Sequence, residues 1–135
     1  MPMRTVVLTL LMILLPHSAK TLELTVLDSG RSVSLPLNET LTIALEGKPA
    51  TGFAWEVSSL DRKVLSTEAA PAYNPESLLP GAGGTYTFRF NPRQQGATTV
   101  KLAYRRPWEK GVKPLKTFEL SVSVTAAEQR YTRAF

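Results

Sequence analysis

The chain has 135 residues, a formal net charge of +5, no cysteine and one histidine. This length fits one domain of ordinary size, and 43% apolar residues suffice for a core, which excludes a disordered chain. Because cysteine is absent, the sequence excludes disulfides, thiolate nucleophiles and Cys-ligated metal sites. The 16 Lys and Arg residues are scattered, without a run of five like charges, so we expect no nucleic-acid partner.

Residues 1–19 have the pattern of a cleaved secretory signal peptide. Arg4 is basic, residues 6–15 are apolar except for Thr9, and the small residue Ala19 suits cleavage after it. This stretch of ten residues is too short to span a hydrocarbon core of about 30 Å, which takes about 20. We therefore expect an exported protein, periplasmic or secreted, with no stable membrane span after cleavage. An uncleaved anchor is the alternative.

The only histidine, His17, lies inside this segment, so the cleaved chain would contain neither His nor Cys. This composition excludes Ser–His–Asp triads, Cys–His dyads and His-ligated metals. A glycosidase would need two facing carboxylates, and in the loops described below only Glu109 stands out. We therefore predict a protein that is not an enzyme and has no catalytic residue, metal site or cofactor.

Apolar and polar residues alternate with a period of two through most of residues 20–125, which is typical of half-buried strands. One polar face per strand favours antiparallel pairing. The sequence predicts an all-β fold, an immunoglobulin-like antiparallel β-sandwich of about seven short strands, as one domain over residues 20–125. The expected strands lie at residues 22–26, 33–37, 41–45, 53–57, 86–90, 98–104 and 118–124.

Three stretches are less regular. Residues 60–67 fit a short helix or a bent strand equally well. Residues 69–84, which contain three prolines and three glycines, are expected to form the longest irregular stretch; a loop of this length in a small domain is usually functional or mobile. Residues 126–135 are predicted to be a polar, basic tail with frayed structure.

Residues 48–53 form the first of three unusual loops. Pro49 fixes its own φ, and Gly52 permits the positive φ of a sharp turn. This would leave Thr51 at an exposed apex before Phe53 re-enters the sheet. The alternative is a connection between strands that was selected for its shape alone.

Residues 78–84 form the second loop. Gly81, Gly83 and Gly84 leave a bare backbone, which another chain can approach closely and pair with. Leu78 and Leu79 would either contact a partner or attach the loop to the core. A phosphate-binding loop is disfavoured, because no GK[ST] follows and the next element is a strand.

Residues 104–111 form the third loop, in which Trp108 follows Arg106 and Pro107. Trp and Arg are enriched at binding hot spots, and proline lowers the entropy lost on docking. The alternative is a Trp108 ring folded over the end of the sandwich, whereas Trp55, which lies in an alternating strand, is predicted to be core. Because loops gather at the ends of a sandwich, the three would form a rigid wedge suited to a cleft.

These loops resemble those of the chagasin family, protein inhibitors of papain-like cysteine peptidases. That family carries N-P-x-T-G-[YF], G-x-G-G and R-P-[WF] in this order. The present chain has KPATGF at 48–53, GAGG at 81–84 and RPW at 106–108. Each motif alone is weak, but the ordered set is fairly specific, and the resemblance covers residues 22–125.

The resemblance implies a monomer that binds papain-like cysteine peptidases reversibly and without a covalent step, by inserting the three loops into the active-site cleft. The first loop would place Thr51 near the catalytic cysteine, and the second would pair along one side through its backbone. Arg106 and Trp108 would pack on the other side, near the catalytic histidine. The implied peptidase-binding residues are Pro49, Ala50, Thr51, Gly52, Phe53, Gly81, Ala82, Gly83, Gly84, Arg106, Pro107 and Trp108.

One residue departs from the family pattern. Lys48 stands where the family usually has Asn, and a lysine side chain cannot accept a hydrogen bond, so a looser first loop or an altered target range is expected. A different class of function also stays open. The chain could be a non-inhibitory exported module that binds a glycan or an envelope protein, with Trp108 and Tyr73 as a stacking platform.

Overall fold

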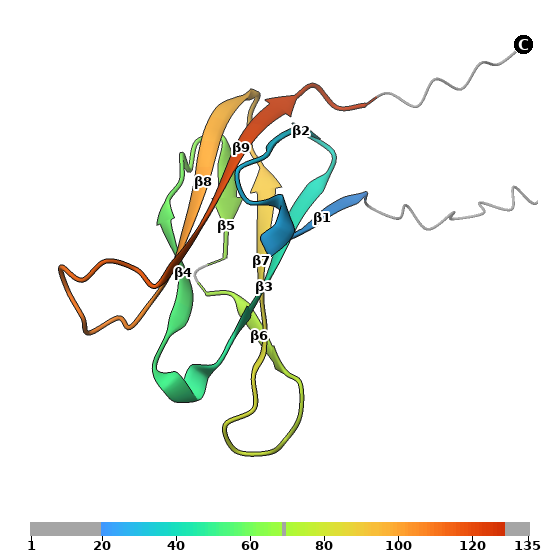
Figure 1. Cartoon of the computed structure of the whole chain (residues 1–135). Helices are drawn as coiled ribbons and strands as arrows, with labels where there is room; N and C mark the ends of the chain where they lie inside the picture. Colours follow the sequence, from blue (N-terminus) through green and yellow to red (C-terminus); the bar gives the residue numbers. More distant parts are fainter. Residues whose placement is uncertain (1–19, 69, 129–135) are drawn as a thin grey trace, which may run out of the picture.

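A computed structural model describes residues 20–68 and 70–128 as two β-sheets packed face to face (Figure 1). The predicted signal peptide and residues 129–135 of the predicted tail lie outside the described residues. Within the described part, no helix is both long enough and apolar enough to cross a membrane. The elements in chain order are β1 (Thr21–Thr25), η1 (Val26–Asp28), β2 (Ser32–Pro36), β3 (Thr40–Gly47), η2 (Pro49–Thr51), β4 (Ala54–Ser59), β5 (Leu65–Thr67), β6 (Ala72–Pro75), β7 (Gly84–Pro92), β8 (Gly96–Arg105) and β9 (Lys116–Thr125).

The predicted sandwich is confirmed, and each of the seven expected stretches falls on a strand. The first sheet has the order β1-β3-β7-β5, with β6 also paired to β7, and the second has the order β2-β9-β8-β4. The two inner faces supply an apolar core that includes Phe88, Phe90, Leu102 and Phe118. Trp55 is 3% exposed, as predicted for a core residue, and its indole N–H donates to the Glu46 carbonyl at 3.0 Å.

The prediction of purely antiparallel sheets is wrong at two pairs of strands. β1 runs parallel to β3, with Leu22 opposite Leu41, and β2 runs parallel to β9, with Val33 opposite Val122. After β1 the chain crosses to the second sheet as β2 and only then returns as β3. Because β1 and β3 are not joined by a hairpin, nothing forces them to run in opposite directions.

The two irregular stretches contain more strand than expected. Residues 60–67 match neither predicted alternative completely, because residues 62–64 form a turn and only residues 65–67 form a strand, β5. The expectation that residues 69–84 are irregular throughout is wrong, because β6 pairs with β7 and places Tyr73 opposite Tyr86 with ring centres 4.8 Å apart. β6 is only four residues long, and Pro71 before it and Pro75 at its end hide the alternation that identifies a longer strand. Among the described residues of this stretch, the irregular part is thereby reduced to residues 70–71 and 76–83.

Candidate functional site

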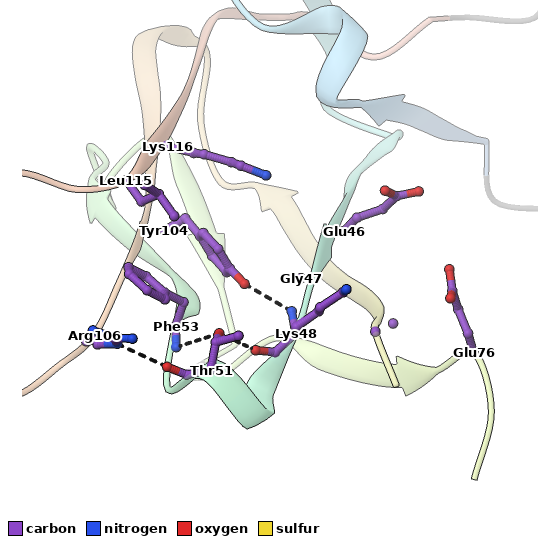
Figure 2. Close-up of a pocket in the computed structure, with 12 residues that line it drawn as sticks. Glu46, Gly47, Lys48, Thr51, Phe53, Glu76, Tyr104, Arg106, Leu115 and Lys116 are labelled. Carbon is purple, nitrogen blue, oxygen red and sulfur yellow. Dashed lines mark hydrogen bonds between the residues drawn. The ribbon is translucent and has the colours of Figure 1, made fainter. Parts of the chain in front are cut away.

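Three loops lie at the same end of the sandwich, as the sequence predicts (Figure 1). Loop 1 (48–53) joins β3 to β4, loop 2 (76–83) joins β6 to β7, and loop 3 (106–115) joins β8 to β9. Residues of all three loops line one open pocket of about 380 Å³, together with the ends of β3, β7, β8 and β9 (Figure 2). The strand ends therefore bring together loops 1 and 3, which are more than 50 residues apart in the sequence.

Loop 1 is a tight turn held by its own hydrogen bonds. The backbone N–H of Thr51 donates to the Lys48 carbonyl at 3.1 Å, and that of Gly52 donates to the Pro49 carbonyl at 2.9 Å. Gly52 then takes φ +82°, as its sequence position predicts. The Thr51 hydroxyl donates to the Lys48 carbonyl at 2.6 Å and accepts from the Phe53 N–H at 3.3 Å. Thr51 is exposed, but its polar groups stiffen the loop.

Lys48 makes no capping hydrogen bond through its side chain. The loop is held at this position by other groups, because the Lys48 N–H donates to the Tyr104 hydroxyl at 3.0 Å and its carbonyl accepts the two bonds from Thr51. The aliphatic part of the lysine lies beside Gly83, where an added Cβ would stand 3.4 Å from Cγ. These contacts with β8 and loop 2 act against the looseness expected from the replacement of Asn, which stays a prediction.

A cluster of aromatic rings supports loop 1 from inside the sandwich. The Tyr104 ring lies 5.3 Å from that of Phe53 and 5.1 Å from that of Trp55, centre to centre. Tyr86 packs close to Gly47, where a Cβ would come within 2.7 Å of its ring. Burial, with smaller effects of Tyr104 and Tyr73, raises the pKa of Tyr86.

Loop 2 presents bare backbone and two exposed leucines. Leu78 is 99% exposed and Leu79 is 74% exposed, so neither attaches the loop to the core. Gly81 takes φ +79° with open space around its Cα. Gly83 is half-buried, and its carbonyl accepts from the Glu76 N–H at 2.9 Å. Large exposed apolar side chains beside accessible backbone suit contact with another protein.

Gly84 differs from the other glycines of this motif. It is buried as the first residue of β7, and an added Cβ would overlap the Asn74 carbonyl oxygen and lie 2.6 Å from the Tyr73 hydroxyl. Its lack of a side chain therefore lets β6 pack against β7. The structure places Gly84 beneath the loop surface and not on it.

Loop 3 places Trp108 against the turn of loop 1. The ring is 67% exposed, and its tip lies so close to Gly52 that an added Cβ there would overlap it. The Trp108 ring is thus neither fully free to contact a partner nor folded over the end of the sandwich, the two predicted alternatives. It packs on the neighbouring loop with one edge and leaves most of its surface to solvent.

Arg106 points toward loop 1 and not outward (Figure 2). Its Nε donates to the Thr51 carbonyl at 3.0 Å, and its Nη1 donates to Glu109 Oε1 at 3.1 Å. Its guanidinium carbon lies 4.5 Å from the centre of the Phe53 ring, a distance at which a cation is attracted to the aromatic face. Arg106 therefore joins loop 3 to loop 1.

The structure sorts the predicted binding residues by exposure. Three further residues, Leu78, Leu79 and Glu109, were not predicted as binding residues. The two leucines could have been found as apolar residues in a glycine-rich loop, whereas nothing in the sequence identified Glu109 as a partner of Arg106. The predicted residues themselves fall into three classes of exposure. Gly84 is buried. Half-buried are Gly52, Phe53, Ala82, Gly83 and Arg106. Exposed at the loop tips are Pro49, Ala50, Thr51, Gly81, Pro107 and Trp108.

Comparison with known proteins agrees with this geometry. Residues 34–122, which run from β2 into β9, match the model of the chagasin family of peptidase inhibitors, I42. Amoebiasin-2 of Entamoeba histolytica is 32% identical over 102 residues, which cover 75% of this chain and 83% of that protein. Chagasin of Trypanosoma cruzi is 31% identical over 90 residues, 64% of this chain and 82% of that protein.

The fold is also similar to a solved structure. The crystal structure of the cysteine protease inhibitor EhICP2 from Entamoeba histolytica aligns with a TM-score of 0.70 at 27% identity. The alignment covers 78% of this chain and 96% of that one, so it spans nearly the whole inhibitor. With the family match over residues 34–122, these relationships show that the chain belongs to the chagasin family of peptidase inhibitors.

Proposed function

We propose that this protein is a reversible inhibitor of papain-like cysteine peptidases that fills the active-site cleft with loops 1, 2 and 3. The observation that carries the proposal is the shared position of the three motif-bearing loops at one end of the sandwich (Figure 1). Family membership supports it, as does the printed description of the similar EhICP2 structure, a cysteine protease inhibitor.

The loop geometry supports inhibition by occlusion. Thr51 lies at the tip of a 3-10 turn that Gly52 closes with a positive φ, and such a turn cannot adopt the extended backbone that pairs with a partner strand. The Thr51 hydroxyl already donates to the Lys48 carbonyl. Loop 1 would therefore cover the catalytic cysteine without offering an extended peptide bond for cleavage. Loops 2 and 3 would contact the two sides of the cleft.

Trp108 is the side chain with the largest exposed aromatic surface among the loops, and we expect it to be the main anchor on the peptidase. Removal of an aromatic hot spot costs about 2 kcal/mol or more, which corresponds to about 30-fold in the inhibition constant. The matched control is Leu27→Ala, because Leu27 is also an exposed apolar residue, at 88%, but lies on η1 and away from the three loops.

The test is a titration of residues 20–135 into papain with a fluorogenic peptide substrate, with trypsin as the control enzyme. We expect stoichiometric, one-to-one loss of papain activity, unchanged trypsin activity, and weaker inhibition by the Trp108→Ala protein but not by the Leu27→Ala protein. Folded protein that leaves papain active at micromolar concentration would reject the proposal. An unchanged inhibition constant for Trp108→Ala would reject the anchor role.

The glycan-binding alternative has less support. Its platform would need Tyr73 and Trp108 to present their ring faces together. The Tyr73 ring is half-buried against Tyr86, whereas Trp108 packs with its ring tip on Gly52. Tyr73 thus belongs to strand β6 and Trp108 to loop 3, and the two rings have different neighbours.

We further propose that the protein acts outside the cytoplasm after removal of residues 1–19. The support is the sequence alone: a basic start, a short apolar stretch and a small residue before Lys20. Expression of the full chain in a secreting host, followed by intact-mass analysis of the exported fraction, tests this. A mass that begins at Lys20 is expected, and a full-length mass in the membrane fraction would instead support the uncleaved anchor.

A further inference from the structure

The Arg106 guanidinium makes three contacts with groups of loop 1 and loop 3. Nε reaches the Thr51 carbonyl, Nη1 reaches Glu109, and the planar group lies over the Phe53 ring (Figure 2). The Thr51 carbonyl lies at the end of η2, where a 3-10 helix leaves its last carbonyls without partners inside the helix. Arg106 therefore supplies from loop 3 the donor that the end of loop 1 lacks.

Glu109 is itself fixed by the backbone of loop 3. Its N–H donates to the Arg106 carbonyl at 3.1 Å, and its own carbonyl accepts from Nη2 of Arg105 at 2.9 Å. Arg105, the last residue of β8, also lies near Glu56 of β4, with 3.5 Å between Nε and Oε1 and no hydrogen bond from Nε to any described residue. The carboxylate of Glu109 thus faces Arg106 from a turn that is anchored to the sheet. The charge of Arg106 is compensated before any partner is present.

This arrangement needs the chemistry of arginine. A guanidinium carries several donors in one plane, so it can bond a carbonyl and a carboxylate while its face lies on an aromatic ring. An ammonium group has a single charged centre and cannot make the same three contacts in one plane. A lysine at position 106 would have to give up the Thr51 carbonyl, the Glu109 carboxylate or the Phe53 face.

We propose that Arg106 and Glu109 are positioning residues, which hold loop 1 in its binding shape in the free inhibitor and bind little of the peptidase themselves. The inference rests on the proposed function and deepens it, because the family resemblance implied that Arg106 packs directly on the peptidase. A loop that already has its bound shape loses less entropy on docking. Where only a fraction of molecules has that shape, the apparent affinity falls by the same fraction.

The experiment joins two measurements on the same variants of residues 20–135. Hydrogen exchange of the loop 1 amides in the free protein reports the order of the loop, and the inhibition constant for papain reports binding. Arg106→Ala and Arg106→Lys are both expected to speed exchange in loop 1 and to weaken inhibition about tenfold or more. Glu109→Gln keeps a side-chain acceptor for Arg106 and should lose less than Glu109→Ala.

Two controls make the result specific to the loop. Amides of β8 and β9 should exchange as slowly as in the wild type, which excludes a general loss of stability. Lys110→Ala removes an exposed cation from the same loop, and it should leave loop 1 exchange unchanged.

Weaker inhibition by Arg106→Ala with unchanged loop 1 exchange would overturn the proposal, because Arg106 would then act by direct contact. Faster exchange with unchanged inhibition would overturn it as well. Failure of the wild-type protein to inhibit papain would reject the proposed function. In that case the exchange data on the free protein would still support or reject the positioning of loop 1 by Arg106.

Discussion

Replacement of Gly52 by alanine is expected to weaken inhibition of papain about 100-fold or more while the sandwich stays folded. Gly52 has φ +82°, and an alanine in the left-handed region costs about 1–2 kcal/mol. The new Cβ would also overlap the tip of the Trp108 ring. The ring must move, so the change also removes an anchor worth about 2 kcal/mol. One methyl group thus disturbs loop 1 and loop 3 together, and every 1.4 kcal/mol lost is about tenfold in affinity.

Gly30 provides a control that separates backbone strain from displacement of the Trp108 ring. Gly30 has φ +87°, lies between η1 and β2, and has no atom within 4 Å of an added Cβ. Gly30→Ala should therefore lower the free energy of unfolding by a similar strain and leave the inhibition constant unchanged. Equal inhibition constants for the two variants would contradict the role assigned to Gly52.

The Gly52 effect can also be traced to Trp108. If alanine acts mainly by moving the ring, the cost of Gly52→Ala should be smaller in a protein that already carries Trp108→Ala. Neighbouring residues that share one interaction are expected to be non-additive in this way. Fully additive losses would show that Gly52 and Trp108 contribute to binding independently.

The sequence predicted the strands well because alternation depends on one face of each strand being buried. Trp55 and Phe88 occupy such positions and are both buried. The same alternation says nothing about which strand lies beside which, so the parallel pairing of β1 with β3 could not be predicted from it. That pairing depends on the crossing to the second sheet between β1 and β3, a property of the whole chain path.

The loops were predicted from residues with special backbone requirements, such as Gly52. This approach did not predict the direction in which the Arg106 side chain points. Gly52 needs its positive φ whatever surrounds it, so its type alone predicted the turn. An arginine in an exposed loop can face a partner or a neighbouring loop. Arg106 faces loop 1 because it bonds the Thr51 carbonyl, 55 residues earlier in the chain. No local sequence pattern predicts that contact.

Gly83, the last residue of loop 2, and Gly84, the first residue of β7, are expected to respond differently to replacement by alanine. Gly84→Ala should lower the free energy of unfolding by about 2–3 kcal/mol, a typical cost of overpacking. Its Cβ would overlap the Asn74 carbonyl oxygen, and strand pairing fixes the backbone on both sides, with Gly47 opposite on β3 and Pro75 opposite on β6. Backbone held in this way cannot relax cheaply.

Gly83→Ala should leave the fold intact and weaken inhibition. An added Cβ would meet Cγ of Lys48 at 3.4 Å and the Gly47 carbonyl oxygen at 3.5 Å, which are ordinary contact distances. Gly83 has no positive φ, so alanine causes no strain there, and the free energy of unfolding should change by about 0.5 kcal/mol or less. The methyl group would, however, stand beside Lys48 in the pocket that the three loops share, where the peptidase is proposed to bind.

Urea denaturation gives the stability of both variants, and papain titration at a temperature where both are folded gives their affinity. The expected pattern is a stability loss confined to Gly84→Ala and an affinity loss of about tenfold for Gly83→Ala, in line with removal of a backbone contact worth about 1.4 kcal/mol. Equal stability losses would contradict the contrast. The sequence shows the two glycines as members of one motif, and their roles differ because β6 packs over Gly84 and stops before Gly83.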